Sequence, residues 1–274
     1  MDYKIKISLI VISLLISINS AAAQTPLSPT ERQTAISRHL IFESDDPDSL
    51  IIYKGYVVSF DTTHKTPNWT IHDLTFTQIR TDTLPRASRR SRFLQDRHNL
   101  NANQQASHDD YTNSGFDRGH FVPAGDFFWD KPQKDDTFFV TNISPQTPDF
   151  NQIVWQNLEI KTRDLILDNR VNATVITGAI YASKRVKNRG LSRKKISIPS
   201  HLFKVVYTKI GNTDHLYCFL VPHMFAYPDK SLTCYQVSLD QIEGLVGEDF
   251  FEQLPDPIEI VLESQVMDAS SWVN

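Results

Sequence analysis

The amino-acid sequence predicts an α+β fold. Strand-like apolar segments follow one another without the regular alternation of strand and helix that a parallel sheet requires, and one long helix interrupts them. Of the 274 residues, 40% are hydrophobic and the formal net charge is −4, which excludes a disordered chain. No internal repeat or linker-like boundary divides residues 51–274, so we expect a single domain over this range.

The first 23 residues are typical of a cleaved secretory signal. Lys4 and Lys6 precede an apolar run at residues 7–18, and Ala21 and Ala23 follow it in the spacing that a signal peptidase accepts. As a helix this run would rise about 18 Å, which is short of the roughly 30 Å of a bilayer core. We therefore expect a signal peptide over 1–23 and a secreted or periplasmic protein with no membrane association after cleavage; an uncleaved anchor is the alternative.

The first part of the mature chain is expected to contain few regular elements. Residues 24–50 form an N-terminal lead-in, helical or irregular, in this prediction. Alternating apolar residues predict a strand over 51–60, with Gly55 as a bulge. The polar stretch 61–115, with several Pro and Asn residues, is expected to be a long functional loop that contains a short strand near 75–79.

The second part of the chain has clearer periodicity. A short buried strand is expected at 138–141, and Pro148 precedes a helix that runs from Asp149 to about Asn169. Four later segments of apolar and β-branched residues predict strands at 171–177, 202–210, 216–221 and 232–237. Ser238 opens a short helix over 239–247.

The chain has two cysteines, which excludes a disulfide-stapled scaffold and a zinc site built on four thiolates. Cys218 and Cys234 fall in successive predicted strands. They would either pair across a hairpin in an oxidising compartment or remain two buried free thiols, and the sequence leaves both alternatives open.

Positive charge is concentrated in two short segments. The first contains Arg86, Arg89, Arg90, Arg92 and Arg97, and the second contains Lys184, Arg185, Lys187, Arg189, Arg193, Lys194 and Lys195. Residues 231–274, in contrast, contain nine acidic residues and no Lys or Arg. This distribution predicts a local positive face for a polyanion; the alternative is that both runs are solvated loops. Arginine predominates in the first run, and its planar fork matches phosphate.

Side chains suited to phosphate chemistry gather between residues 116 and 159. Asp117, Arg118 and His120 fall within four positions, and Asn142 follows the short predicted strand. The predicted helix then carries Asn151, Trp155 and Glu159, whose spacing places all three near one face. A polar Asn and a Glu that flank a Trp are unusual for a core stripe, so we expect this face to line a site.

The residue types indicate a hydrated metal ion and a general base. Asn151 and Glu159 lie about 12 Å apart along a helix axis, so one of them is expected to bind the ion directly and the other through water or by orienting an Arg. Mg²⁺ tolerates a carboxamide ligand with water in the remaining positions. His120 titrates near neutrality and can take a proton from water, and Arg118 can neutralise charge developing on a phosphoryl group.

Each of these residues also has an ordinary structural interpretation. Asp117 and Arg118 could form a surface ion pair, His120 a satisfied hydrogen-bonding residue, Asn142 a turn, Asn151 a first-turn helix position and Glu159 a solvated helix position. Singly these interpretations suffice, but they do not explain the joint order and spacing.

The segment Phe116-Asp117-Arg118-Gly119-His120, followed by Thr141-Asn142-Ile143-Ser144-Pro145-Gln146 and by Asn151, Trp155 and Glu159, resembles the DNA/RNA non-specific endonucleases. That family includes a secreted bacterial nuclease and mitochondrial endonuclease G. The resemblance covers roughly residues 50–250 and includes the segment Ile198-Pro199-Ser200-His201-Leu202-Phe203-Lys204-Val205. It implies a ββα-metal motif on a central antiparallel sheet flanked by helices.

The resemblance also implies a role for each residue. His120 would be the general base, Asn151 the one direct protein ligand of a single Mg²⁺ or Mn²⁺ ion, and Glu159 a contact to metal-bound water. Arg118 would stabilise the transition state, and Asn142 would hold the geometry by hydrogen bonding. The nucleic-acid-binding set comprises Asp117, which braces the loop, and an upstream Arg that is Arg90 or Arg92, with Arg89 as a competitor.

The expected activity is hydrolysis of DNA and RNA without sequence preference, leaving 5′-phosphates. Family members are often homodimers, so a homodimer is a further expectation of the resemblance. The first alternative is a catalytically silent nucleic-acid-binding module on the same scaffold. The second alternative is a phosphodiesterase or phosphatase for small substrates, which the basic runs disfavour.

Overall fold

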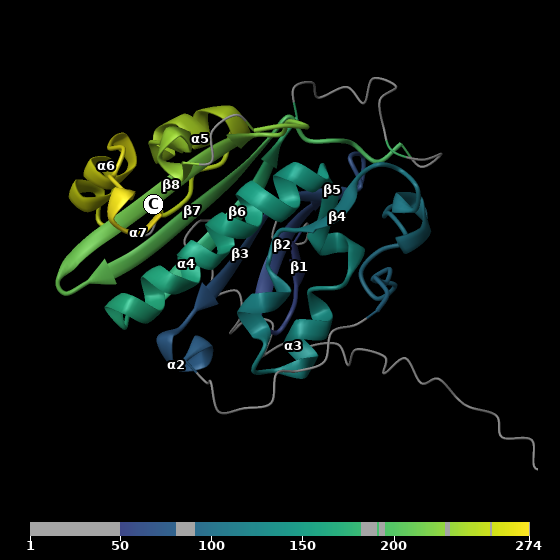
Figure 1. Ribbon diagram of the computed structural model, residues 1–274, viewed down its shortest axis with the longest axis horizontal. Coiled ribbons are helices and arrows are strands. Elements are labelled where there is room, and N and C mark those ends of the chain that lie inside the picture. Colours follow the sequence, from purple (N-terminus) through teal and green to yellow (C-terminus); the bar gives the residue numbers. More distant parts are fainter. Residues whose placement is uncertain are drawn as a thin grey trace, which may run out of the picture.

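Seven strands of the computed structural model pair in the order β1-β2-β3-β6-β7-β8-β9, and every neighbouring pair is antiparallel (Figure 1). The structure describes residues 50–80, 91–181, 191, 195–227, 231–252 and 254–273. The strands are β1 (Leu50–Ile52), β2 (Tyr56–Asp61), β3 (Thr66–Leu74), β6 (Ala173–Ile180), β7 (His201–Ile210), β8 (Thr213–Pro222) and β9 (Gln236–Val237). The predicted α+β class with a central antiparallel sheet is confirmed.

Helices cover both faces of the sheet. On one face α4 (Gln156–Asn169) and α7 (Ser270–Val273) pack against β6, β7 and β8. On the other face α5 (Leu239–Val246) and α6 (Asp256–Ser264) pack over the same strands. Figure 1 shows α4 running along the strands of the sheet, with α5, α6 and α7 grouped near β8. The sheet is therefore the middle of three layers, and a hydrophobic core lies between the sheet and the helices on each of its faces.

Side-chain alternation along β7 explains how one strand serves two cores. Leu202 and Val206 belong to the core beneath α4, whereas Phe203 and Val205 belong to the core beneath α5. All four are fully buried, as is expected for a strand covered on both faces. Lys204 occupies the α4 side of the same strand and is also buried, and this places a cation inside a hydrophobic core.

Helix ends follow the capping rules. Ser238 accepts a hydrogen bond from the backbone of Gln241 and forms a capping box at the start of α5. Gly247 ends that helix in the left-handed conformation, with φ of 74°. The helix expected over 239–247 is confirmed.

Several shorter helices connect the strands. They are α2 (Phe76–Ile79), η2 (His108–Tyr111), η3 (Ala124–Phe127), α3 (Lys131–Asp136), η4 (Val140–Asn142) and η6 (Leu232–Tyr235).

The structure corrects the prediction for residues 51–80. The single strand expected over 51–60 is two strands, β1 and β2, and Gly55 lies in the turn between them, where added side-chain bulk would meet Phe127 and Gln133. The stretch expected to be a loop contains β3, which lies between β2 and β6 in the sheet. Its polar residues were misleading, because Thr66, Thr70 and His72 are all buried.

Three further strand predictions are wrong wholly or in large part. The segment expected at 75–79 is helix α2, capped by the Thr75 side chain. Residues 138–141 contribute one bridge, between Leu94 and Phe139, before the 3₁₀ helix η4, and the strand follows at residues 143–146. The segment expected at 232–237 is mostly the 3₁₀ helix η6, and two residues of it pair as β9.

Several predictions lie outside the described residues. They are the signal peptide over 1–23, the lead-in up to residue 49, Arg89 and Arg90, and all of the second basic run except Lys195. Both cysteines are free thiols; Cys218 is buried and Cys234 is exposed. Within the described ranges no helix has the length and apolar character needed to cross a membrane.

Candidate active site

The Asp-Arg-Gly-His motif forms one strand of a separate two-stranded ribbon. β4 (Asp117–His120) pairs antiparallel with β5 (Ile143–Gln146). Because side chains alternate along a strand, Arg118 and His120 project from one face and Asp117 from the opposite face. The ribbon therefore presents an Arg and a His side by side.

Gly119 separates these two residues for a steric reason. A Cβ at Gly119 would overlap the side-chain amide of Gln146 on β5. Gln146 is fully buried and lies on the same face of the ribbon as Gly119. Any larger residue at position 119 would push the two strands apart and displace His120.

Two aromatic rings hold the His120 imidazole. The Phe93 ring lies 5.3 Å from it between centroids, and the Phe138 ring lies 5.2 Å away in an edge-to-face arrangement. Both phenylalanines belong to a small buried cluster beneath the ribbon. His120 itself is partly exposed, so packing orients the ring while part of the residue stays at the surface.

Arg118 is held by backbone and aromatic contacts. Its Nε and Nη2 atoms donate to the His108 carbonyl at 3.2 and 2.8 Å, and Nη2 donates to Thr112 Oγ1 at 3.2 Å. The guanidinium carbon also lies 5.9 Å from the Phe93 ring centroid and 5.7 Å from that of Tyr111. Since Phe93 touches both Arg118 and His120, it fixes the two side chains relative to each other.

Asn142 fastens the chain that leaves β4. Its Oδ1 accepts from the Val122 backbone N–H at 2.9 Å, and its Nδ2 donates to the carbonyls of Val122 and Thr137 at 2.9 and 3.0 Å. The side chain is fully buried. These three bonds fix the chain two residues beyond His120 to the segment that leads into β5.

Asp117 connects the ribbon to the helix that follows it. Its Oδ2 accepts from Asn151 Nδ2 at 2.9 Å and from Gln152 Nε2 at 2.7 Å. With its NH₂ group used in this way, Asn151 directs its amide oxygen away from the Asp117 carboxylate. That oxygen has the hard-donor chemistry that Mg²⁺ prefers.

The helix that carries Asn151 does not begin as an ordinary α-helix. Residues Phe150–Trp155 form one π-helical turn, η5, before α4 starts at Gln156, and the Asn151 N–H donates to the Thr147 carbonyl at 2.9 Å. Such wide turns are rare and frequently occur at functional sites. We expected Asn151, Trp155 and Glu159 to line the site together. This prediction is wrong for Trp155, which is fully buried in the core beneath α4.

Glu159 has a buried cation as its neighbour. Lys204 Nζ donates to Thr177 Oγ1 at 2.8 Å and lies 4.9 Å from the Trp155 ring centroid. Burial raises the pKa of Glu159 to about 7, and attraction to Lys204 and Arg163 limits that rise. Burial lowers the pKa of Lys204, against the attraction of Glu159 and Asp126.

Arg163 and Asp126 extend this charge network. Arg163 Nη1 donates to Asp126 Oδ1 at 2.6 Å, and His72 Nε2 lies 2.9 Å from Asp126 Oδ2. Burial alone would raise the pKa of Asp126, but the hydrogen bonds from His72 and Arg163 lower it. The network joins α4, the short helix η3 that follows the motif, and the central strand β3.

Arg92 forms an ion pair outside the group of predicted site residues. Its Nη2 pairs with both carboxylate oxygens of Asp109, at 3.0 and 2.9 Å, on an exposed surface. Arg92 directly precedes Phe93, whose ring contacts both Arg118 and His120. Its competitors Arg89 and Arg90 lie outside the described residues.

A network of charged and polar side chains behind Glu159 was not predicted from the sequence; it consists of His72, Asp126, Arg163 and Lys204. Two signals were present. Arg163 follows Glu159 by four residues, which is the spacing of a helical ion pair. Lys204 stands alone among apolar residues in a predicted strand, and a charge in such a position usually has a specific partner.

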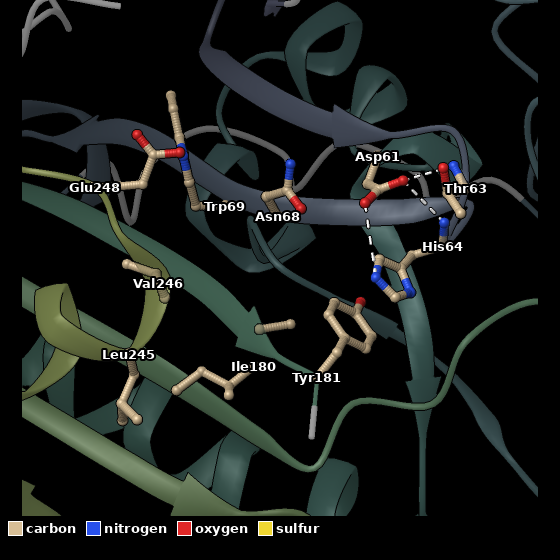
Figure 2. A pocket seen from close by; sticks show the side chains of 11 residues that line it. Asp61, Thr63, His64, Asn68, Trp69, Ile180, Tyr181, Leu245, Val246 and Glu248 are labelled. Atoms are coloured by element: carbon tan, nitrogen blue, oxygen red, sulfur yellow. Dashed lines mark hydrogen bonds and ion pairs between the residues drawn. The ribbon is translucent and has the colours of Figure 1, made fainter. Parts of the chain in front are cut away.

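A separate cavity of about 370 Å³ lies elsewhere on the molecule. Figure 2 shows it between the β2–β3 turn, the end of β6 and the end of α5, with Asp61, His64, Tyr181 and Glu248 at its wall. None of the predicted site residues lines it. The candidate active site is instead the open face around β4 and η5.

The β4–β5 ribbon bears Arg118 and His120, and the helix that follows it carries Asn151 in its first turn. Together with the central sheet, these elements define a ββα-metal nuclease fold. Comparison with known sequences agrees with this class. The family model for DNA/RNA non-specific endonucleases matches residues 37–257, and the chain belongs to this family.

Curated relatives include nucleases from several kingdoms. Nuclease C1 of Cunninghamella echinulata var. echinulata is 30% identical over 210 residues, which cover 73% of this chain and 82% of that protein. Mitochondrial Endonuclease G of Homo sapiens is 28% identical over 71% of this chain and 66% of its own length. Mitochondrial Nuclease EXOG of Xenopus laevis is 29% identical over 74% of this chain and 58% of its own length. The chain thus spans less than two thirds of the length of these two mitochondrial relatives.

A solved structure gives the same fold. The crystal structure of an EndoG/EndoGI complex superposes with a TM-score of 0.72 at 24% sequence identity, covering 84% of this chain and 95% of that chain. At this identity the match supports the fold assignment, in agreement with the family assignment from sequence.

Proposed function

We propose that the protein is an exported, metal-dependent endonuclease that hydrolyses DNA and RNA without sequence preference. The observation that carries this proposal is the pairing of Arg118 and His120 on one face of β4, with Asn151 tied to the start of the same strand through Asp117. Metal-assisted phosphodiester hydrolysis requires a general base, a positioned positive side chain and an oxygen ligand for the metal ion, and His120, Arg118 and Asn151 supply these in turn.

The donor set fits a hard divalent cation. The family is one of metal-dependent nucleases. Asn151 offers an amide oxygen, and Glu159 offers a carboxylate whose charge Lys204 and Arg163 favour. No sulfur ligand and no cluster of imidazoles is found among the described site residues, so oxygen-preferring Mg²⁺ or Mn²⁺ suits the site better than zinc. When bound, such an ion supplies Lewis-acid stabilisation of phosphoryl charge.

The side chains of the site would divide the remaining work. His120 takes a proton from a water molecule as the water oxygen attacks phosphorus, and the bond from phosphorus to the 3′ oxygen breaks. The phosphate stays on the 5′ side, and the departing 3′ oxygen takes up a proton from solvent. Arg118 neutralises the charge that grows on the phosphoryl oxygens, and its contacts with His108 and Thr112 mean that it needs no reorganisation.

Sequence and sugar indifference would follow from the contacts. The proposed groups interact with phosphate, metal and water, and none of them reads a base edge or a 2′-hydroxyl. Export would rest on the signal-like segment over 1–23. Association as a homodimer is the remaining expectation for the assembly.

The direct test incubates supercoiled plasmid and a long RNA with the mature protein, with Mg²⁺ and with chelator. We expect both polymers to be cut to fragments bearing 5′-phosphates, and chelator to stop cleavage. Retardation of DNA without any cleavage would favour the silent binding module. Hydrolysis of a chromogenic monoester or diester without attack on plasmid would favour a small-substrate enzyme.

A further inference from the structure

An exposed aromatic cluster adjoins the candidate site. Phe225 is 72% exposed, more than any other large apolar side chain in the described part of the chain, and Met224 beside it is 37% exposed. The Phe225 ring lies 6.0 Å from the Phe116 ring, which in turn lies 6.2 Å from His223. A single exposed apolar residue needs no explanation, but a contiguous group of this kind usually marks a contact surface. We call Phe116, His223 and Phe225 the aromatic platform.

The backbone that carries Phe225 is held in place. The Met224 N–H donates to the Tyr227 hydroxyl at 2.9 Å, and that hydroxyl donates to the Pro222 carbonyl at 2.6 Å. The Met224 carbonyl accepts from Thr147 Oγ1 at 2.5 Å. An aromatic side chain on a fixed backbone loses little conformational entropy when a ligand binds, so its exposure is suited to recognition.

His223 ties the platform to the start of the site helix. Its Nε2 accepts from the Thr147 N–H at 2.8 Å, and its Nδ1, which therefore carries the proton, donates to the Pro199 carbonyl at 2.9 Å. Thr147 also accepts the hydrogen bond from the Asn151 N–H. One residue thus holds both the platform loop and the proposed metal ligand.

Phe116 supplies the connection to the other half of the site. It directly precedes Asp117, whose carboxylate holds the Asn151 and Gln152 amides. The platform is therefore continuous with the Asp117 end of β4 and with the start of η5. A polymer whose phosphate reaches Asn151 would pass next to these rings.

We propose that the aromatic platform stacks an unpaired nucleobase adjacent to the scissile phosphate. The proposal rests on the proposed nuclease function and adds to it a preference for single-stranded or unstacked substrate. Every base has a π face, so stacking tolerates any sequence. A paired base inside a duplex does not present that face, and it would gain nothing from Phe225.

The test measures oligonucleotide binding by fluorescence anisotropy in a His120→Ala background with Mg²⁺, where cleavage is suppressed. Removing one base–aromatic stack costs about 1–3 kcal/mol, so Phe225→Ala should weaken single-strand binding by about 5- to 150-fold. Duplex binding should change by less than about twofold, and Phe225→Trp should retain single-strand binding. Ile260→Ala, which truncates a 65% exposed side chain on α6, is the control and should leave both affinities unchanged.

Oligonucleotides with one abasic position, moved along the strand, locate the stacked base. When the abasic position coincides with the stacked base, the protein that retains Phe225 and the Phe225→Ala variant should bind the oligonucleotide with equal affinity. If Phe225→Ala behaves like Ile260→Ala on single strands while the protein with an intact His120 cuts DNA, the platform is wrong and the nuclease function stands. If the intact protein neither binds nor cuts nucleic acid, both proposals fall together.

Discussion

The side-chain amide of Asn151 donates a 2.9 Å hydrogen bond to the carboxylate of Asp117. This bond joins the first turn of the site helix to the first residue of β4. It orients the amide so that the oxygen, and not the nitrogen, is free for a cation. Asp117 thus acts on the proposed metal site by positioning Asn151, and its negative charge makes direct contact with a phosphate unfavourable.

Replacement of Asn151 by Ala should raise the Mg²⁺ concentration needed for half-maximal activity by at least about tenfold, because the one direct protein ligand is removed. Cleavage rates across a Mg²⁺ titration measure this shift. Gln152→Ala is the matched control, since Gln152 donates to the same carboxylate but sits at an exposed position. Unchanged metal dependence in Asn151→Ala would remove it as the ligand.

His120→Ala should lower kcat by about 10²- to 10⁴-fold, the usual effect of removing a general base. The side chain is partly exposed, so the melting temperature and DNA affinity should stay close to those of the wild type. Single-turnover cleavage of a labelled duplex separates the chemical step from product release. A variant that retained more than about a tenth of the wild-type rate would disprove the base assignment.

Lys204→Met should move the pH dependence of cleavage upward. The Lys204 ammonium lowers the pKa of Glu159, which burial has raised to about 7, so its loss raises that pKa further. The ionised carboxylate would then form at higher pH, and activity lost at pH 7 should recover as the pH is raised. Lys204→Arg keeps the charge and should restore part of the profile. A uniform loss at every pH would instead indicate a packing defect.

The carboxylates between α5 and α6 should make the fold less stable as pH rises. Burial and, after it, neighbouring acidic residues together raise the pKa of Glu263 to about 8 and that of Glu243 to about 7. The folded state therefore holds more protons than the unfolded state from about pH 4.5 to 8, and stability falls with pH across that window. Glu263→Gln should raise Tm by a few degrees at pH 8.5.

At pH 5 the same Glu263→Gln variant should melt like the wild type, because the native carboxyl is already protonated. Asp168→Asn, on the exposed end of α4, is the control and should change Tm at neither pH. Differential scanning calorimetry at the two pH values measures both variants. A lower Tm for Glu263→Gln at pH 8.5 would show that the ionised carboxylate stabilises the native state.

The sequence predicted the parts of this molecule that depend on local pattern. The β7 and β8 strands have buried apolar residues on both faces, and the helix that begins at Ser238 has its capping box written in residues 238 and 241. The site motif was recognisable because its residues are close together. In contrast, β3 was missed because its polar residues are buried by tertiary packing, and composition cannot report that.

Two features of the site depend on contacts between distant segments. The π turn over Phe150–Trp155 has the same apolar spacing as an ordinary helix, so its sequence gives no sign of the wider turn. Lys204 and Glu159 are 45 positions apart, and they become neighbours because α4 packs on β7. The structure was required to show that a buried cation favours the ionised form of a residue at the candidate site.

The opposite orientation of neighbouring side chains on β4 has a consequence for how this segment can change. Arg118 and His120 point to one side, while Asp117 points to the other and holds the helix. A single-residue insertion or deletion within these four positions would reverse the orientation of every side chain beyond it relative to those before it, so Asp117, Arg118 and His120 could no longer face their present partners together. We therefore expect homologous chains to keep the length of this strand constant.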